Sequence, residues 1–301
     1  MDAIQKSMLE KIADLHEVPE GAYNIRSNGA LAGRNTTANI DIVTKQDKPG
    51  IDIIIKPGTK NESVHIPVIL SESGLNDCVY NDFYIGEGAD VVIVAGCGIH
   101  NCGTDTSEHD GIHTFFIGKN AKEKHYGEGD GTGEKILNPT TIVHIDEGGY
   151  MEMETTQIKG VDSTIRDTQA DLKDGASLVI KEKIMTHGNQ TAETNFVVNL
   201  DGVDSSANVI SRSVAKDSSK QVFNSKICGN NKCYGHTECD AILMDNGHVN
   251  AVPSLEANDL DASLIHEAAI GKIAGEQLIK LMTLGLTEHE AEEQIINGFM
   301  K

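Results

Sequence analysis

The chain of 301 residues is poor in aromatic side chains and in positive charge. It contains no Trp, aromatic residues make up 4% of it, and 25 Lys and Arg stand against 46 Asp and Glu, which gives a net charge of −21. A surface of this sign repels phosphate groups, and single-stranded nucleic acid also needs aromatic platforms for stacking. The composition therefore excludes nucleic acid as a partner.

Long hydrophobic runs are also missing. No window approaches the roughly 18 uninterrupted apolar residues of a membrane span, and residues 1–17 are charged throughout, without the apolar stretch of a signal peptide. We therefore expect a cytoplasmic protein without membrane contact. Because cytosolic thiols stay reduced, the six cysteines should not form a disulfide framework.

The beginning of the chain predicts one helix and the middle predicts strands. Apolar residues at spacings of three and four predict a helix that ends near residue 17: Ile4, Met8, Leu9, Ile12 and Leu15. From about Tyr23 to Ala262, short and often alternating apolar runs are separated by Gly, Asn and Asp. We divide the chain into an N-terminal helix at 1–22, a β-structured core at 23–262 and a C-terminal helical segment at 263–301.

Small residues recur through the β-structured core at nearly constant steps, as at Gly148, Gly175, Gly202 and Gly229. A repeat of this length with two or three short strands predicts a β-solenoid whose rungs stack. An antiparallel β-sandwich is the alternative. It is less favoured because only some of the Asn-Gly and Asp-Gly pairs lie between strand-like runs, as tight hairpins would require.

Helical periodicity returns after Asp261. Ile270, Ile273 and Leu278 begin an apolar stripe, and Thr287 followed by Glu290 forms a capping box for a last helix. Two such helices could simply cap the end of a solenoid, or they could present an apolar surface to a partner protein.

Three of the six cysteines lie in the stretch CGNNKCYGHTECD at 228–240: Cys228, Cys233 and Cys239. They could be disulfide partners, ligands of a structural zinc, ligands of an iron–sulfur cluster, or small core residues. The spacing is looser than in most structural zinc sites, and thiolates are the preferred ligands of iron–sulfur clusters, which favours the cluster. We predict one cluster site formed by the three thiolates.

A second group of metal-ligand residues lies between positions 97 and 113: Cys97, His100, Cys102, His109 and His113. His125 follows about one rung after the first of them. The group could bind iron or zinc. Alternatively, it could be a solvated loop whose histidines bond to the backbone.

Four motifs resemble the SufB/SufD family of iron–sulfur cluster assembly proteins. They are SRSVAKDSSK at 211–220, ECDAIL at 238–243, VPSLEA at 252–257 and HEAAIGKIAGEQLIKLMTLGLTEHEAEEQIINGF at 266–299. The resemblance implies a right-handed parallel β-helix with C-terminal helices that dock a SufC-like ABC ATPase. It also implies a scaffold, not an enzyme, on which a nascent cluster, expected to be [4Fe–4S], is assembled.

The resemblance also assigns residues. Cys239 falls on the cysteine that the family uses for cluster assembly, Glu267 on its acidic partner and His266 on the histidine between them. Because one period of the repeat separates Cys239 from His266, we expect them to lie one strand apart on neighbouring rungs. Glu267 would be an exchangeable fourth ligand beside the three thiolates.

The expected partners are a second copy of the chain, the ATPase, a cysteine desulfurase or other sulfur donor, and apo-proteins that receive the cluster. Two other functions compete with the scaffold. One is a metalloenzyme in which the residues from Cys97 to His113 hold a zinc-bound water, and the other is an ATPase adaptor that binds no cluster.

Overall fold

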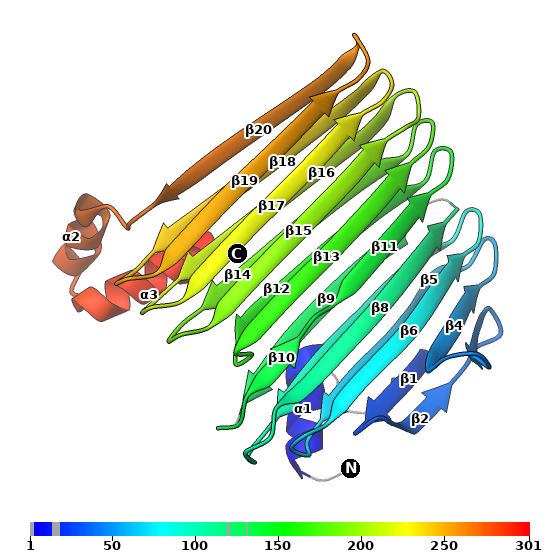
Figure 1. Cartoon of the computed structure of the whole chain (residues 1–301), viewed down its shortest axis with the longest axis horizontal. Coiled ribbons are helices and arrows are strands. Elements are labelled where there is room, and N and C mark those ends of the chain that lie inside the picture. Colours follow the sequence, from blue (N-terminus) through cyan, green and yellow to red (C-terminus); the bar gives the residue numbers. More distant parts are fainter. Residues whose placement is uncertain (1–2, 14–18, 119–120, 131) are drawn as a thin grey trace.

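The computed structural model describes residues 3–13, 19–118, 121–130 and 132–301. Within these ranges the chain forms a parallel β-solenoid in which successive turns add strands to two facing sheets, and the rungs run from the N-terminal to the C-terminal end (Figure 1). The sandwich alternative is wrong, because among the described residues the strand pairs are parallel except for two antiparallel hairpins at the N-terminal end, β1 with β2 and β3 with β4.

We call the two sheets A and B. The strands of sheet A, in spatial order, are β2 (Ala30–Asn35), β1 (Ala22–Ser27), β5 (Lys60–Leu70), β7 (Asp90–His100), β9 (Ala121–Asp130), β12 (Tyr150–Lys159), β14 (Ser177–Thr186), β16 (Ser205–Ala215), β18 (Cys233–Leu243) and β20 (Ala262–Gly271). Those of sheet B are β19 (His248–Ala257), β17 (Lys220–Gly229), β15 (Thr191–Leu200), β13 (Ser163–Leu172), β10 (Lys135–Leu137) with β11 (Thr140–Ile145), β8 (Ser107–Ile117), β6 (Asn76–Ile85), β4 (Gly50–Ile55) and β3 (Ile40–Thr44).

The core lies between the two sheets and is built by alternation along each strand. In β15, Phe196, Val198 and Leu200 are at most 1% exposed, whereas Val197 on the outer face is 36% exposed. Since successive side chains of a strand point to opposite faces, alternate residues of a strand face the interior, and the apolar ones from Ala22 to Cys239 form one large cluster. The alternation read from the sequence is thereby confirmed.

The rungs stack with a nearly constant offset, as the recurring small residues predict. This offset is the number of residues between two residues that pair on neighbouring strands of one sheet. It is short between β12 and β14, where Tyr150 pairs with Ser177, and longer between β6 and β8, where Asn81 pairs with His113. Small residues mark the turns between strands. Gly175, for example, has a φ of 63°, a left-handed conformation that glycine adopts without a steric penalty.

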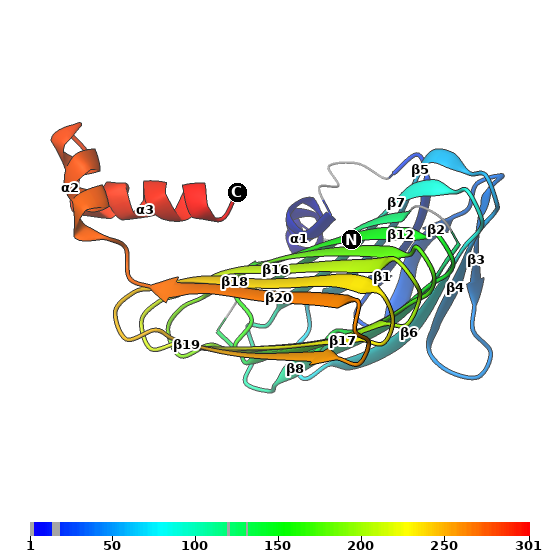
Figure 2. The same cartoon turned by 90° about the horizontal axis from the view of Figure 1, so that it is seen from above.

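An N-terminal helix, α1 (Ala3–Ala13), packs on the outer face of sheet A (Figure 2). Met8, Leu9 and Ile12 are buried against this face, as their spacing predicts, while Leu15 lies outside the described residues. The fit is close, because a Cβ added to Gly96 of β7 would come within 2.3 Å of the Ile12 carbonyl oxygen.

The C-terminal helical segment begins later than the sequence suggests. Residues 262–271 form strand β20, and the helices follow as α2 (Gly275–Thr283) and α3 (Glu288–Phe299), on the same side of sheet A as α1 (Figure 2). The predicted capping box of Thr287 and Glu290 is present at the start of α3. No helix in the described part of the chain has the length and apolar character that a membrane crossing needs.

Candidate functional site

The three thiols of the stretch 228–240 do not lie together. Cys233 and Cys239 both point into the core from β18, but the extended strand between them separates them by about 20 Å. Cys228 lies near the end of β17 on the outer face, with its Sγ 3.5 Å from Oε2 of Glu256. Within one molecule the three thiols are therefore too far apart to share one site, and their positions do not support that prediction.

Cys239 and His266 share the interior but are not directly opposite. The rung between β18 and β20 is longer than the repeat period, so Cys239 pairs with Ala268, and His266 pairs with the buried Thr237. Diagonal neighbours of this kind have Cα atoms about 8 Å apart, within reach of long side chains. The two residues lie on neighbouring strands, as expected, but they are offset by two positions in the register, and both point to the same space.

Nδ1 of His266 is shielded from solvent and has no hydrogen-bond partner in the described part of the chain. A buried imidazole nitrogen without a partner costs free energy unless a ligand or a metal satisfies it. His266 therefore fits a ligand position beside Cys239.

Glu267 points to the opposite side. It is 67% exposed on the outer face of β20, directly across from Glu238 of β18, and its Oε2 lies 3.7 Å from Nε2 of His236. Because Cys239 faces the interior, strand β18 stands between the thiol and the Glu267 carboxylate. The expectation that Glu267 is a fourth ligand beside Cys239 does not fit this geometry.

A polar row leads along the interior of sheet A to Cys239. Glu182 of β14 pairs with Ser211 of β16, which pairs with Cys239. The Glu182 carboxylate accepts hydrogen bonds from Ser211 (2.9 Å) and Thr194 (3.0 Å) and lies 3.6 Å from Nε of Arg166. These side chains are all at most 3% exposed, so the pair of Arg166 and Glu182 is a buried ion pair.

The environment of Cys239 keeps its thiol protonated. Burial, followed by the negative charges of Glu182 and Asp240, raises the pKa of Cys239 to about 12. Burial also raises the pKa of Glu182, against the opposing effect of Arg166. A metal that binds Cys239 must therefore displace a proton and open a site that is 1% exposed.

The second group of predicted ligands divides into two parts. Cys97 on β7 and His109 and His113 on β8 point into the core. His100 ends β7, and Cys102 follows it on an exposed loop, with 3.1 Å between His100 Nε2 and the Cys102 Sγ. The structure does not gather the five residues around one point, and metal binding by either part stays a prediction.

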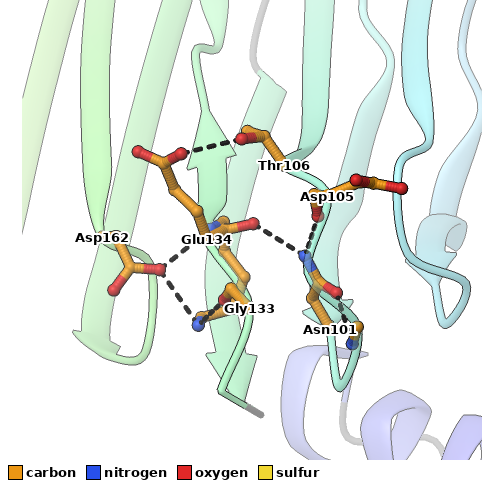
Figure 3. A network of polar contacts seen from close by, with 8 residues as sticks. Asn101, Asp105, Thr106, Gly133, Glu134 and Asp162 are labelled. Atoms are coloured by element: carbon orange, nitrogen blue, oxygen red, sulfur yellow. Dashed lines mark hydrogen bonds and ion pairs between the residues drawn. The ribbon is translucent and has the colours of Figure 1, made fainter.

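The loop that carries Cys102 is held by a buried amide (Figure 3). Asn101 is fully buried, and its Nδ2 donates to the carbonyl oxygens of Asp105 (2.8 Å) and Glu134 (2.9 Å). Its Oδ1 accepts from the Gly103 backbone (3.1 Å). These contacts fix the turn after β7. The side chain of His125, in the neighbouring strand β9, lies outside the described residues.

Inside the core, His109 belongs to a chain of charged groups. Arg26 lies 2.8 Å from Oδ1 of Asp77, and Oδ2 of Asp77 lies 3.2 Å from Nδ1 of His109. Burial alone lowers the pKa of His109, but Cys97 and Asp77 outweigh it and raise that pKa to about 10.

The pKa of His113 shifts in the opposite direction to that of His109, although the two residues lie on the same strand and the same face. Burial, followed by the charge of His109, lowers the pKa of His113 to about 3, so its ring is neutral at pH 7. The ring packs against Phe83, with 5.7 Å between centroids, and its Nε2 lies 3.4 Å from Nδ2 of Asn81. These contacts make His113 a core residue of the sheet.

Comparison with known proteins decides the family. The model of the SUF system FeS cluster assembly SufBD core domain matches residues 78–299, which is more than two thirds of the chain. The chain belongs to the SufBD family. This membership implies a role in iron–sulfur cluster assembly, and the matched range includes Cys97, Cys239, His266 and both C-terminal helices.

Similar proteins carry the same family name. The SufBD family protein of Methanocaldococcus jannaschii is 31% identical over 255 residues, which cover 82% of this chain and 79% of the relative. The SufBD family protein of Archaeoglobus fulgidus is 31% identical and covers 85% and 69%. A SufBD family protein of Pyrococcus horikoshii is 28% identical over 283 residues, which cover 92% of this chain and 86% of the relative. The resemblance read from the C-terminal motifs thus extends over most of the chain.

Several residues near the candidate site escape the sequence analysis. Arg166 and Glu182 look like ordinary exposed charges until the rungs are stacked, and Asp77 lies a whole rung before its partner His109. A signal existed for His236 and Glu238, because they alternate with Thr237 and Cys239 in the HTEC motif. Alternation places them on one face of a strand, opposite to the thiol.

The charge of His109 predicts a pH-dependent stability. Its folded pKa is raised from 6.5 to about 10 by Cys97 and Asp77, so the stabilisation that these two residues give the charged imidazole is complete below pH 6.5 and is lost as the pH rises through 10. Replacing Asp77 by Asn should destabilise the protein by a few kcal/mol near pH 6 and by less near pH 10. Urea unfolding at both pH values measures this, and a difference independent of pH would contradict it.

Proposed function

We propose that this chain is a non-catalytic scaffold on which a nascent iron–sulfur cluster is assembled at Cys239, with His266 as a second ligand. The observation behind the proposal is that both residues face the interior of the last two rungs of sheet A, inside the range matched by the family model. Thiolate and imidazole are suitable ligands for iron, and thiolates suit clusters in particular.

The cluster is cargo that arrives and leaves. Its sulfur would come from a donor such as a cysteine desulfurase, and apo-proteins would receive the finished cluster. Because Cys239 is 1% exposed and its thiol is protonated, assembly requires both a movement of the last rungs and the release of a proton. Two features of the C-terminal end support such a movement.

The first feature is the open end of the solenoid. Strands β19 and β20 are the last of their sheets, and they leave a row of unpaired backbone groups and several exposed apolar side chains: Val252, Leu255, Ile265 and Ile270. Such an edge is a template for pairing with another strand. A second copy of the chain, which carries the same edge, would cover it in a homodimer and would bring two Cys239 sites close to the interface.

The second feature is the apolar surface of the C-terminal helices. Helix α2 has no buried residue, and Ile279, Met282 and Leu284 are 61%, 43% and 80% exposed. Burying large apolar side chains of this kind contributes roughly 1.5–3 kcal/mol each, which favours a partner on this face. We assign this surface to a SufC-like ABC ATPase. Residue 275 follows β20 closely, so a pull on α2 would reach the strand that carries His266.

A chain that ends after Ala274 should test the dock. It keeps all of β20, whereas a cut at Ala262 would remove that strand and uncover the core. The shortened chain should remain dimeric but lose ATPase binding in pull-down and calorimetry. Replacing Ile279 and Leu284 by Glu should reduce ATPase binding by at least about 10-fold, since two buried apolar contacts are lost.

Val203 is the matched control for these two residues, because it is an equally apolar residue that is 41% exposed at a solenoid turn. Replacing Val203 by Glu should leave ATPase binding unchanged. Equally tight binding by the chain that ends after Ala274 would place the dock elsewhere.

A further inference from the structure

The outer face of the last two strands of sheet A gathers three side chains that can bind a metal ion. His236 and Glu238 project from β18, and Glu267 projects from β20. One ligand atom of each lies within 4.8 Å of the other two, and the three residues are half-buried or exposed. In the described part of the chain, no other set of three such residues is this close.

Asn208 of β16 orients the imidazole of His236. Its Oδ1 lies 2.9 Å from Nδ1 of His236, which holds that nitrogen as the donor and leaves the Nε2 lone pair on the side of Glu267. Metal-binding histidines are commonly oriented in this way, by an acceptor on the nitrogen that does not bind the metal. The contact therefore prepares Nε2 to be a ligand.

The two carboxylates provide an independent observation. Glu238 and Glu267 are directly opposite in the register of β18 and β20, an arrangement in which like charges repel. A local excess of negative charge between two strands is stabilised by a bound cation.

We propose that His236, Glu238 and Glu267 bind one divalent transition-metal ion. Imidazole with two carboxylates suits Fe²⁺, Mn²⁺ and Zn²⁺, and three protein ligands leave positions for water or an incoming group. Bonds of about 2.0–2.2 Å place two ligands of one ion no more than about 4.4 Å apart, so only a small closure of the side chains is needed.

The position of this site suggests a use. Glu238 precedes Cys239 in the same strand, so the metal would lie on the outer face of β18 and the thiol on the inner face. The site could hold Fe²⁺ next to the place where the cluster is assembled, and this use depends on the proposed function. The binding of a metal ion by the three residues does not depend on it.

Mn²⁺ is a suitable probe because its binding to the full-length chain can be followed by electron paramagnetic resonance without sulfide or reductant. The wild type should bind one Mn²⁺ per chain at this site. Asn208→Ala removes a supporting residue and should weaken Mn²⁺ binding by roughly 10- to 100-fold. His236→Ala and Glu267→Gln each remove a ligand and should weaken Mn²⁺ binding by more than this.

His144 provides the matched control, because its Nδ1 lies 3.3 Å from Oδ2 of Asp171 on the outer face of sheet B, without a third ligand among the described residues. His144→Ala should leave Mn²⁺ affinity unchanged. Wild-type binding no stronger than that of a Glu238→Gln/Glu267→Gln double variant would overturn the proposal.

Cys239→Ser separates this inference from the proposed function, because that variant should keep the Mn²⁺ site. Loss of Mn²⁺ binding in Cys239→Ser would contradict a site made of the three outer residues. A wild type that assembles a cluster but binds no Mn²⁺ would overturn this inference alone.

Discussion

Replacing Cys239 by Ser should abolish the brown chromophore that the wild-type chain forms on anaerobic reconstitution with iron and sulfide. Iron and sulfide bound per chain should fall by more than the roughly 10- to 100-fold that loss of a supporting residue costs, because a thiolate ligand itself is removed. The fold should persist, since Ser is close in size to Cys and Ser211 lies directly opposite as a hydrogen-bond partner. Visible absorption and circular dichroism measure the two effects.

The other two cysteines of the same stretch are matched controls. Cys228 faces outward toward Glu256, and Cys233 lies about 20 Å from Cys239 along the strand, so Cys228→Ser and Cys233→Ser should keep the chromophore. Equal loss in all three variants would show that the three thiols act as one site, as their spacing in the sequence suggests. A colourless wild type would favour the adaptor without a cluster.

Removing one partner of the buried ion pair should cause the largest loss of stability. Glu182→Ala leaves Arg166 charged and 3% exposed in the core, and breaking a buried pair in this way costs about 3–5 kcal/mol. Replacing both residues, as in Arg166→Met/Glu182→Leu, should recover most of this loss because neither charge of the pair remains. Urea unfolding with the free energy extrapolated to water provides the measurement.

The adjacent residue in the same strand is the control for this experiment. Lys181 lies on the outer face, where its Nζ is 2.8 Å from Oε1 of Glu152, and it is 46% exposed. Lys181→Ala should change the free energy of unfolding by no more than about 1 kcal/mol, as for other exposed ion pairs. If Glu182→Ala were as mild as Lys181→Ala, the buried pair of Arg166 and Glu182 would not be a major source of stability, and the prediction would be wrong.

Much of the architecture could be predicted from the sequence. Alternation at Phe196, Val198 and Leu200 identifies a strand and its buried face, and the recurring glycines identify the stacked rungs. The capping box at Thr287 locates the last helix. These signals are local, because they depend on the periodicity of a single strand or on the few residues of one turn or helix end.

The end of the β-structured core is harder to predict. The sequence pattern extends the helical segment back to residue 263, because the apolar residues of the stretch 262–271 continue into the stripe of α2. In the structure this stretch pairs with β18 throughout, and the helices begin only at Gly275. Pairing with a neighbouring strand decides between two conformations that the local pattern alone allows.

Alternation along the strand places Cys239 on the same face as Cys233 and Thr237, and this can be read from the amino-acid sequence alone. Only the stacked rungs decided which residues of the next strand share that face. If the last rung were shorter by a single residue, Cys239 would pair with Glu267, whereas it pairs with Ala268 and Glu267 turns outward to His236 and Glu238. Side chains alternate with a period of two, so a single residue in rung length moves a whole strand's set of side chains to the other face of the sheet.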